Sequence, residues 1–184
     1  MPAIIRNAEA FRERIAIHDE GLSYTYGDLL EASRDLGSVL LSGAEDLSGK
    51  CVAFMVDPGF GYVSAQWAIW RAGGVAVPLC LTHPLPSLAY VLEDTQAKIL
   101  IISPRFESLL SDHARDHGIR MIVQGREPVA MRQSMPDVDA ARAAMILYTS
   151  GTTSKPKGVV LTHDNLEAQI RTLTEAWGLS LIHI

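Results

Sequence analysis

The sequence predicts an α/β fold, a doubly wound parallel sheet with flanking helices. Short, almost continuously apolar runs alternate along the chain with segments of helical periodicity. Continuous apolar runs are typical of strands that are covered on both faces, and strand–helix alternation is typical of parallel sheets. The 184 residues are enough for one core of ordinary size.

Five strands are predicted from apolar runs that lie between turn or helix signals. They are Lys50–Val56, Gly74–Leu79, Lys98–Ser103, Ile119–Gln124 and Ala143–Tyr148. A further short apolar run, 159–161, follows the last of them and also reads as a strand. The stretch 125–139 has no periodicity and is predicted to be a loop.

Five amphipathic helices are predicted between and after these strands. The first begins at Thr25, with Asp28 at the acidic position of a capping box. The second spans about Phe60–Arg71 and ends before the pair Gly73-Gly74. Apolar stripes define the first and the last three: Leu29, Ser33, Leu36, Leu40 and Gly43; Leu85, Leu88 and Leu92; Phe106, Leu109, Leu110 and His113; Leu166, Ile170, Leu173 and Trp177.

Composition excludes several classes of protein. Hydrophobic residues make up 48% and charged residues 20%, which is typical of a soluble globular domain and argues against disorder. The net charge of −5 provides no basic footprint for nucleic acid, and no apolar run is long enough to span a membrane. The N-terminus lacks an apolar signal core, so we expect an intracellular protein, cytoplasmic by default with mitochondria as the alternative.

The segment Tyr148–Gly158 (YTSGTTSKPKG) carries the chemistry of the sequence. Its hydroxyl side chains can donate hydrogen bonds, Gly151 allows a tight turn, and Lys157 can bring a positive charge to phosphate oxygens. A polyphosphate is the ligand that this pattern suits. The residues predicted to bind it are Thr149, Ser150, Gly151, Thr152, Thr153 and Lys157, and Lys157 is also the candidate catalytic residue.

Two other interpretations of this segment are a solvated hairpin and a P-loop. A solvated hairpin is the ordinary one, because Gly, Ser, Thr and Pro are common in turns, but the ordered series of hydroxyls, glycine and lysine argues against it. A P-loop requires a glycine before the lysine, a serine or threonine after it, and a following helix. Here Pro156 precedes Lys157, Gly158 follows it, and a strand comes next.

Three motifs in order resemble the adenylate-forming (AMP-binding) superfamily of acyl-CoA synthetases, peptide-synthetase adenylation domains and luciferases. YTSGTTSKPKG is similar to its phosphate-loop motif, with Ser154 where glycine is commonest. LSYTYGDL at 22–29 and WRAGGVAVPL at 70–79 resemble two earlier elements. Residues 63–100 look most like the malonyl- and methylmalonyl-CoA synthetases.

The resemblance implies the incomplete N-terminal portion of the large domain of such an enzyme, over residues 1–178. It implies ATP, Mg²⁺ and coenzyme A as cofactors or co-substrates and a small carboxylic acid as substrate. No residue of this chain is assigned to the metal. The adenine-binding, metal-binding and C-terminal catalytic parts would lie in a missing C-terminal remainder, so we expect this chain alone to be inactive. The alternative is a non-catalytic nucleotide-binding or interaction module.

A few other residues carry weaker expectations. Residues 179–184 (LSLIHI) do not continue the family pattern and are expected to be a non-native or truncation tail. His163 is expected either to cap the last helix or to line the nucleotide cleft. Trp67 and Trp70 lie three residues apart on a predicted helix, which is the spacing of core residues. His83 lies beside two prolines and is expected to be a surface histidine in a loop. Cys51 and Cys80 lie in apolar runs and are expected to be small buried residues.

Overall fold

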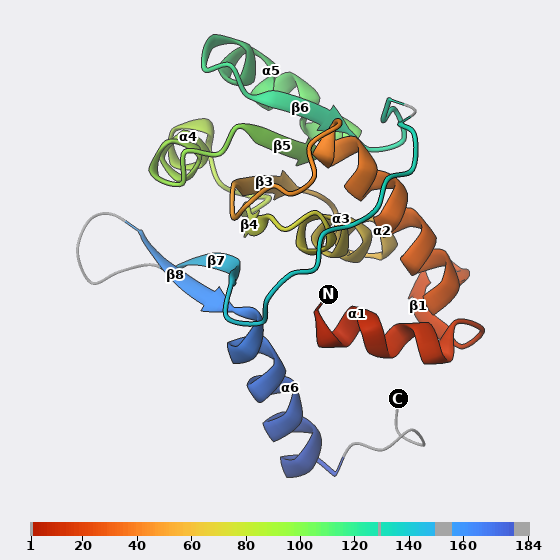
Figure 1. Ribbon diagram of the computed structural model, residues 1–184. Coiled ribbons are helices and arrows are strands. Elements are labelled where there is room, and N and C mark those ends of the chain that lie inside the picture. Colours follow the sequence, from red (N-terminus) through yellow and green to blue (C-terminus); the bar gives the residue numbers. More distant parts are fainter. Residues whose placement is uncertain (1, 129, 150–155, 179–184) are drawn as a thin grey trace.

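The computed structural model of the protein describes residues 2–128, 130–149 and 156–178, and its main element is a six-stranded sheet (Figure 1). The strand order is β6-β5-β3-β4-β7-β8. These strands are β3 (Cys51–Met55), β4 (Val75–Pro78), β5 (Ile99–Ile102), β6 (Arg120–Val123), β7 (Ala143–Thr149) and β8 (Lys157–Thr162). A separate antiparallel pair consists of β1 (Ile15–Asp19) and β2 (Leu22–Thr25).

The helices precede, connect and follow the strands. They are α1 (Ala3–Ala8), α2 (Tyr26–Leu41), α3 (Phe60–Arg71), α4 (Leu85–Asp94), α5 (Glu107–Asp116) and α6 (His163–Ala176), with short 3-10 helices η1 (Glu9–Phe11) and η2 (Pro104–Phe106). The five predicted strands and five predicted helices are therefore confirmed, α3 with the predicted bounds. Among the described residues, no helix is long and apolar enough to cross a membrane.

The sheet is mostly parallel rather than wholly so. β3 to β7 pair in parallel, as predicted, whereas β8 pairs antiparallel with β7. The reason is the short connection from β7 to β8, which is long enough for a hairpin but not for a parallel crossover. The predicted doubly wound parallel sheet is therefore confirmed, with β8 as its one antiparallel strand among the described residues.

Two hydrophobic clusters, one on each face of the sheet, explain why its strands are continuously apolar. Along β3, Val52 and Phe54 belong to the cluster beneath α2 and α3, while Ala53 and Met55 belong to the cluster beneath α4 and α5. Alternate residues of a strand point to opposite faces, so both sets of positions must be apolar here. The doubly wound arrangement follows from this pattern.

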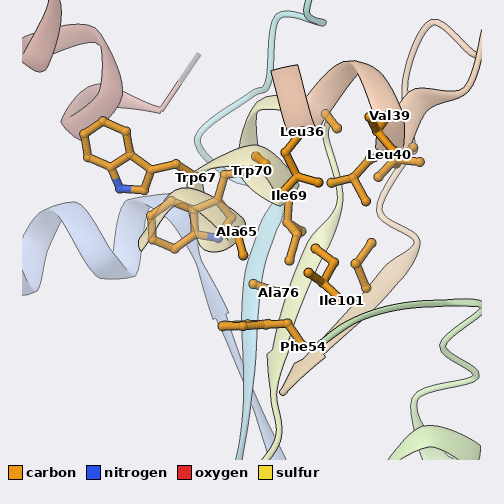
Figure 2. Packing of buried hydrophobic residues seen from close by; sticks show 14 of the residues in the cluster. Leu36, Val39, Leu40, Phe54, Ala65, Trp67, Ile69, Trp70, Ala76 and Ile101 are labelled. Atoms are coloured by element: carbon orange, nitrogen blue, oxygen red, sulfur yellow. The ribbon is translucent and has the colours of Figure 1, made fainter. Parts of the chain in front are cut away.

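The larger cluster joins α2 and α3 to the sheet (Figure 2). Its close-up shows Leu36, Val39 and Leu40 of α2 beside Ile69 of α3, above Phe54 and Ile101 of the strands. Trp67 and Trp70 are 4% and 6% exposed, which confirms them as core residues. The indole Nε1 of Trp70 donates to the carbonyl oxygen of Ala144 at 2.7 Å and so connects α3 to β7.

Local sequence signals set the ends of the helices. Thr25 and Asp28 form the predicted capping box at the start of α2. Ser42 is the C-cap of that helix, so Gly43 lies beyond it and is not part of its stripe. Gly73 has a φ of +76°, and a Cβ there would lie 2.1 Å from Asp46 Oδ1. Both the backbone and the close approach of Asp46 therefore require glycine.

The burial of Cys80 and the N-terminal elements differ from the sequence predictions. Cys80 is exposed rather than buried, because it lies just beyond the end of β4; Cys51 is half-buried. The hairpin of β1 and β2 and the short helix α1 were not predicted, since their burial is partial and their apolar pattern is weak. The described residues of the predicted loop 125–139 form no helix or strand.

Candidate nucleotide-binding site

The β7–β8 hairpin brings together two of the predicted phosphate-binding residues. Thr149 pairs with Lys157 at the end of the ladder, and both are exposed. β7 is parallel to β4, so Thr149 lies at the carboxyl edge of the sheet, where α/β folds bind their ligands. The other predicted members, Ser150, Gly151, Thr152 and Thr153, lie outside the described residues, as do Ser154 and residues 179–184.

Beyond Met145 the hairpin separates from the rest of the sheet. The ladder between β4 and β7 consists of the pair Ala76 and Met145, whereas the ladder between β7 and β8 continues to Thr149 and Lys157. Figure 1 shows the two strands extending away from the sheet as a ribbon. The position of this end of the hairpin therefore depends on contacts other than sheet hydrogen bonds.

Helix α4 supplies such contacts through Tyr90 and Asp94, which lie four residues apart. The hydroxyl of Tyr148 donates to Asp94 Oδ2, and the hydroxyl of Tyr90 donates to the carbonyl oxygen of Pro156 at 3.2 Å. The two tyrosine rings meet edge to face, with 6.4 Å between centroids. Partial burial, reinforced by the Asp94 carboxylate, raises the pKa of Tyr148, so its hydroxyl keeps the proton that it donates.

Gly158 makes room for the Tyr148 ring. The two residues pair directly across the hairpin, and a Cβ on Gly158 would lie 3.3 Å from Tyr148 Cζ and 2.9 Å from Ile146 Cγ2. Its φ is not in the left-handed region. Glycine is therefore needed at this position for space rather than for an unusual backbone conformation, which the sequence pattern alone did not reveal.

An ion pair fixes the opposite end of the hairpin. Both terminal guanidinium nitrogens of Arg142 donate to Asp46, at 2.7 and 3.0 Å, and Nη2 also donates to the carbonyl oxygen of Gly73. The guanidinium of Arg142 lowers the pKa of the Asp46 carboxyl. The backbone carbonyl of Arg142 accepts from the N–H of His163 at 3.2 Å. This network joins the start of β7 to the turn after α3.

His163 lies at that fixed end, away from the predicted phosphate contacts. It is the first residue of α6, whereas the cap is Thr162, which forms a capping box with Asn165. The helix-cap expectation for His163 is therefore wrong. The ring is 6% exposed and packs edge to face on Trp70, at 5.7 Å between centroids. Burial, helped by the charge of Arg142, lowers the pKa of His163 to about 4.

An apolar groove of about 800 Å³ opens beside His163. Ile4 and Phe11 of the N-terminal segment line one side, Leu166 and Ile170 of α6 line the other, and Trp67 lies between them. Its lining is mainly apolar and also includes the polar side chains of Asn7, Arg14, Glu167 and Gln169. His83 is exposed in the loop before α4, as expected of a surface histidine. In the described ranges, no three His, Cys, Asp or Glu residues are placed to hold a metal ion.

Comparisons with known proteins identify the family of the chain. Residues 4–182 match the family described as AMP-binding enzyme. The mitochondrial malonate–CoA ligase of Xenopus laevis is 34% identical, and the match covers 98% of this chain and 34% of that protein. The human mitochondrial malonate–CoA ligase is 36% identical, over 95% of this chain and 32% of that protein.

A solved structure has a similar fold. Apo MatB from Rhodopseudomonas palustris is 27% identical and superposes with a TM-score of 0.80, over 92% of this chain and 36% of that one. The chain thus spans about a third of the length of the relatives that it matches. The family match extends over nearly all of its residues, and the motifs at 22–29, 70–79 and 148–158 lie within it. The chain therefore belongs to the family of AMP-binding enzymes.

Proposed function

We propose that the full-length protein containing this chain is an ATP-dependent acid–thiol ligase. It would join a carboxylate to AMP with release of pyrophosphate, and then transfer the acyl group to coenzyme A. Malonate or another short carboxylic acid is the proposed substrate. The observation that carries this proposal is the similarity to two malonate–CoA ligases over 95–98% of the chain.

Within that reaction, the hairpin end is the proposed grip on the β- and γ-phosphates. Exposed Lys157 lies directly across from the hydroxyl-bearing Thr149, and both are at the carboxyl edge of the sheet. The proposal extends to Ser150, Gly151, Thr152 and Thr153, which lie between them in sequence. A fixed positive charge and hydroxyl donors stabilise the charge that grows on pyrophosphate as it leaves.

Mg²⁺ is proposed to accompany the nucleotide and to neutralise part of the phosphate charge. The described residues offer no three-ligand cluster for it, so no residue of this chain is assigned to the metal. The chain by itself is proposed to be inactive, because it spans about a third of its relatives' length. The proposed location is mitochondrial, which is the location that the names of both vertebrate relatives give.

The test is pyrophosphate exchange into ATP by the full-length protein with malonate, methylmalonate, acetate and a longer fatty acid, followed by acyl-CoA formation. We expect exchange with malonate or another short acid. Lys157→Ala should reduce the rate by about 10–1,000-fold, as for loss of one charge-stabilising group. Lys50→Ala removes another exposed lysine and serves as the matched control. Absence of exchange with every acid would refute the proposal.

A further inference from the structure

The structure points to a role for helix α4 as the support that positions the phosphate-binding end of the β7–β8 hairpin. We propose that Tyr90 and Asp94 are positioning residues, which act through Tyr148 and Pro156 on the adjacent phosphate-binding residues Thr149 and Lys157. This role rests on the proposed function, because the phosphate contacts of Thr149 and Lys157 belong to that proposal.

The first step is that the sheet does not itself hold this end of the hairpin. β7 pairs with β4 at Met145, and the hairpin then continues through Tyr148–Gly158 to Thr149–Lys157. A two-stranded ribbon without further support is marginally stable in water. Side-chain contacts to the neighbouring helix can therefore decide where its end lies.

The second step is that α4 is firmly attached to the sheet. Leu88, Val91 and Leu92 are 1%, 6% and 2% exposed and pack in the cluster that contains β3 and β5. Tyr90 and Tyr148 pack against the edge of the same cluster. A helix held by three buried side chains is a rigid base from which two polar groups can reach the hairpin.

The third step is the geometry of the two attachments. Tyr90 and Asp94 are four residues apart, so they lie on one face of α4. Asp94 accepts from the Tyr148 hydroxyl on β7, and the Tyr90 hydroxyl donates to the Pro156 carbonyl just before β8. One helix face therefore holds both strands of the hairpin. Each attachment lies one residue from a proposed phosphate contact, Tyr148 next to Thr149 and Pro156 next to Lys157.

The fourth step is that the hairpin leaves space for the Tyr148 ring to reach α4. Tyr148 reaches Asp94 with its ring lying against Gly158, where a Cβ would come within 3.3 Å of Tyr148 Cζ. The absence of a side chain at Gly158 is thus a requirement of the same arrangement. A tyrosine that served only to fill space would not need a carboxylate partner for its hydroxyl.

The experiment uses single substitutions in the full-length protein. Tyr148→Phe and Tyr90→Phe remove one hydroxyl each and keep the rings. We expect each to raise the KM for ATP in pyrophosphate exchange by about 5–30-fold, the effect of one lost hydrogen bond, with the KM for the carboxylate unchanged. Asp94→Ala should match Tyr148→Phe, whereas Asp94→Asn keeps an acceptor and should retain most of the affinity for ATP.

The control is Tyr24→Phe, a phenol-to-phenyl change in β2, where the ring stacks on Phe60 at 4.1 Å between centroids. Kinetics equal to this control in the Tyr90 and Tyr148 variants would overturn the proposal. A fall in melting temperature with equal changes in both KM values would also overturn it, because that result describes a purely structural role.

Hydrogen exchange separates this proposal from the proposed function, because it needs no activity. Amides of 146–149 and 157–160 should exchange faster in Tyr148→Phe and Tyr90→Phe than in Tyr24→Phe. If the unmodified protein shows no pyrophosphate exchange, the ligase assignment fails, and hydrogen exchange alone then decides whether α4 holds the hairpin. Equal exchange rates in all three variants would show that it does not.

Discussion

Helices α3 and α6 are both predicted to be amphipathic, yet they are buried to very different extents. Seven of the 12 residues of α3 are buried, whereas in α6, with 14 residues, His163 is the buried one. α3 packs against both α2 and the sheet within the larger hydrophobic cluster, while α6 borders the apolar groove. An apolar pattern therefore identifies the face that a helix can bury, but the face is buried only where another element packs against it.

The largest contrast should come from a matched pair of isoleucines. Ile69 of α3 is fully buried, whereas Ile170 of α6 is 46% exposed. Ile69→Ala should lower the free energy of unfolding of this chain by about 2–5 kcal/mol, because it removes packed methylenes and leaves a cavity. Chemical denaturation with circular dichroism measures the change. A loss below about 1 kcal/mol would contradict the core position of α3.

A pH-dependent loss of stability should arise where α6 meets the core. The pKa of His163 is lowered to about 4 from its ordinary value of 6.5, so the folded chain keeps the ring neutral. Between these values the unfolded chain binds a proton that the folded chain does not. Stability from this group is therefore complete above about pH 6.5 and falls, by roughly 3 kcal/mol in total, as the pH drops to about 4.

His163→Gln supplies the control for that prediction. Glutamine does not titrate in this window, so the part of the pH dependence that comes from His163 should disappear in the variant. Denaturation midpoints at several pH values between 4 and 7 give both curves. Parallel curves for the two proteins would show that the imidazole is not held neutral.

A smaller effect is expected at the hairpin. Gly158→Ala should cost about 1–3 kcal/mol, because its Cβ would overlap Ile146 Cγ2 at 2.9 Å. In an Ile146→Ala background the same change should cost less, since the overlapping methyl is gone. A double-mutant cycle of thermal denaturation measures this coupling. Additive effects would mean that Gly158 is needed for another reason.

The smallest effect should be Ile170→Ala on α6. About half of this side chain is already exposed, and alanine is the better helix former, so the two contributions nearly cancel. We expect a change in unfolding free energy within about 0.5 kcal/mol. The same denaturation assay used for Ile69→Ala makes the comparison direct. A loss equal to that of Ile69→Ala would show that α6 is packed as tightly as α3.

Much of the fold was predictable because strands covered on both faces leave a strong pattern. The runs around β3 and β5 are apolar at every position, and the capping box of Thr25 and Asp28 fixes the start of α2. The hairpin of β1 and β2 was not predicted, since every residue of both strands is at least partly exposed and the alternation is weak. The antiparallel direction of β8 depends on the short connection after β7, not on the composition of the strand.

The part of the candidate site that has a local sequence pattern could also be predicted. The order of hydroxyls, glycine and lysine points to phosphate chemistry, and the register of the hairpin places Thr149 opposite Lys157. The contacts of Tyr90 and Asp94 with this hairpin were not predicted. They join positions 54 and 66 residues apart, and no local pattern reports such a pairing.

The alternation of strands and helices, the cap of α2 and the phosphate-binding pattern that begins at the end of β7 could all be predicted from the amino-acid sequence. These follow from burial periodicity and local hydrogen bonding, which act within a few residues. Two features could not be predicted from the sequence: His163 is buried against Trp70, and α4 forms hydrogen bonds to both sides of the hairpin. Those outcomes depend on which distant groups approach in space, and that is set by the packing of the whole sheet.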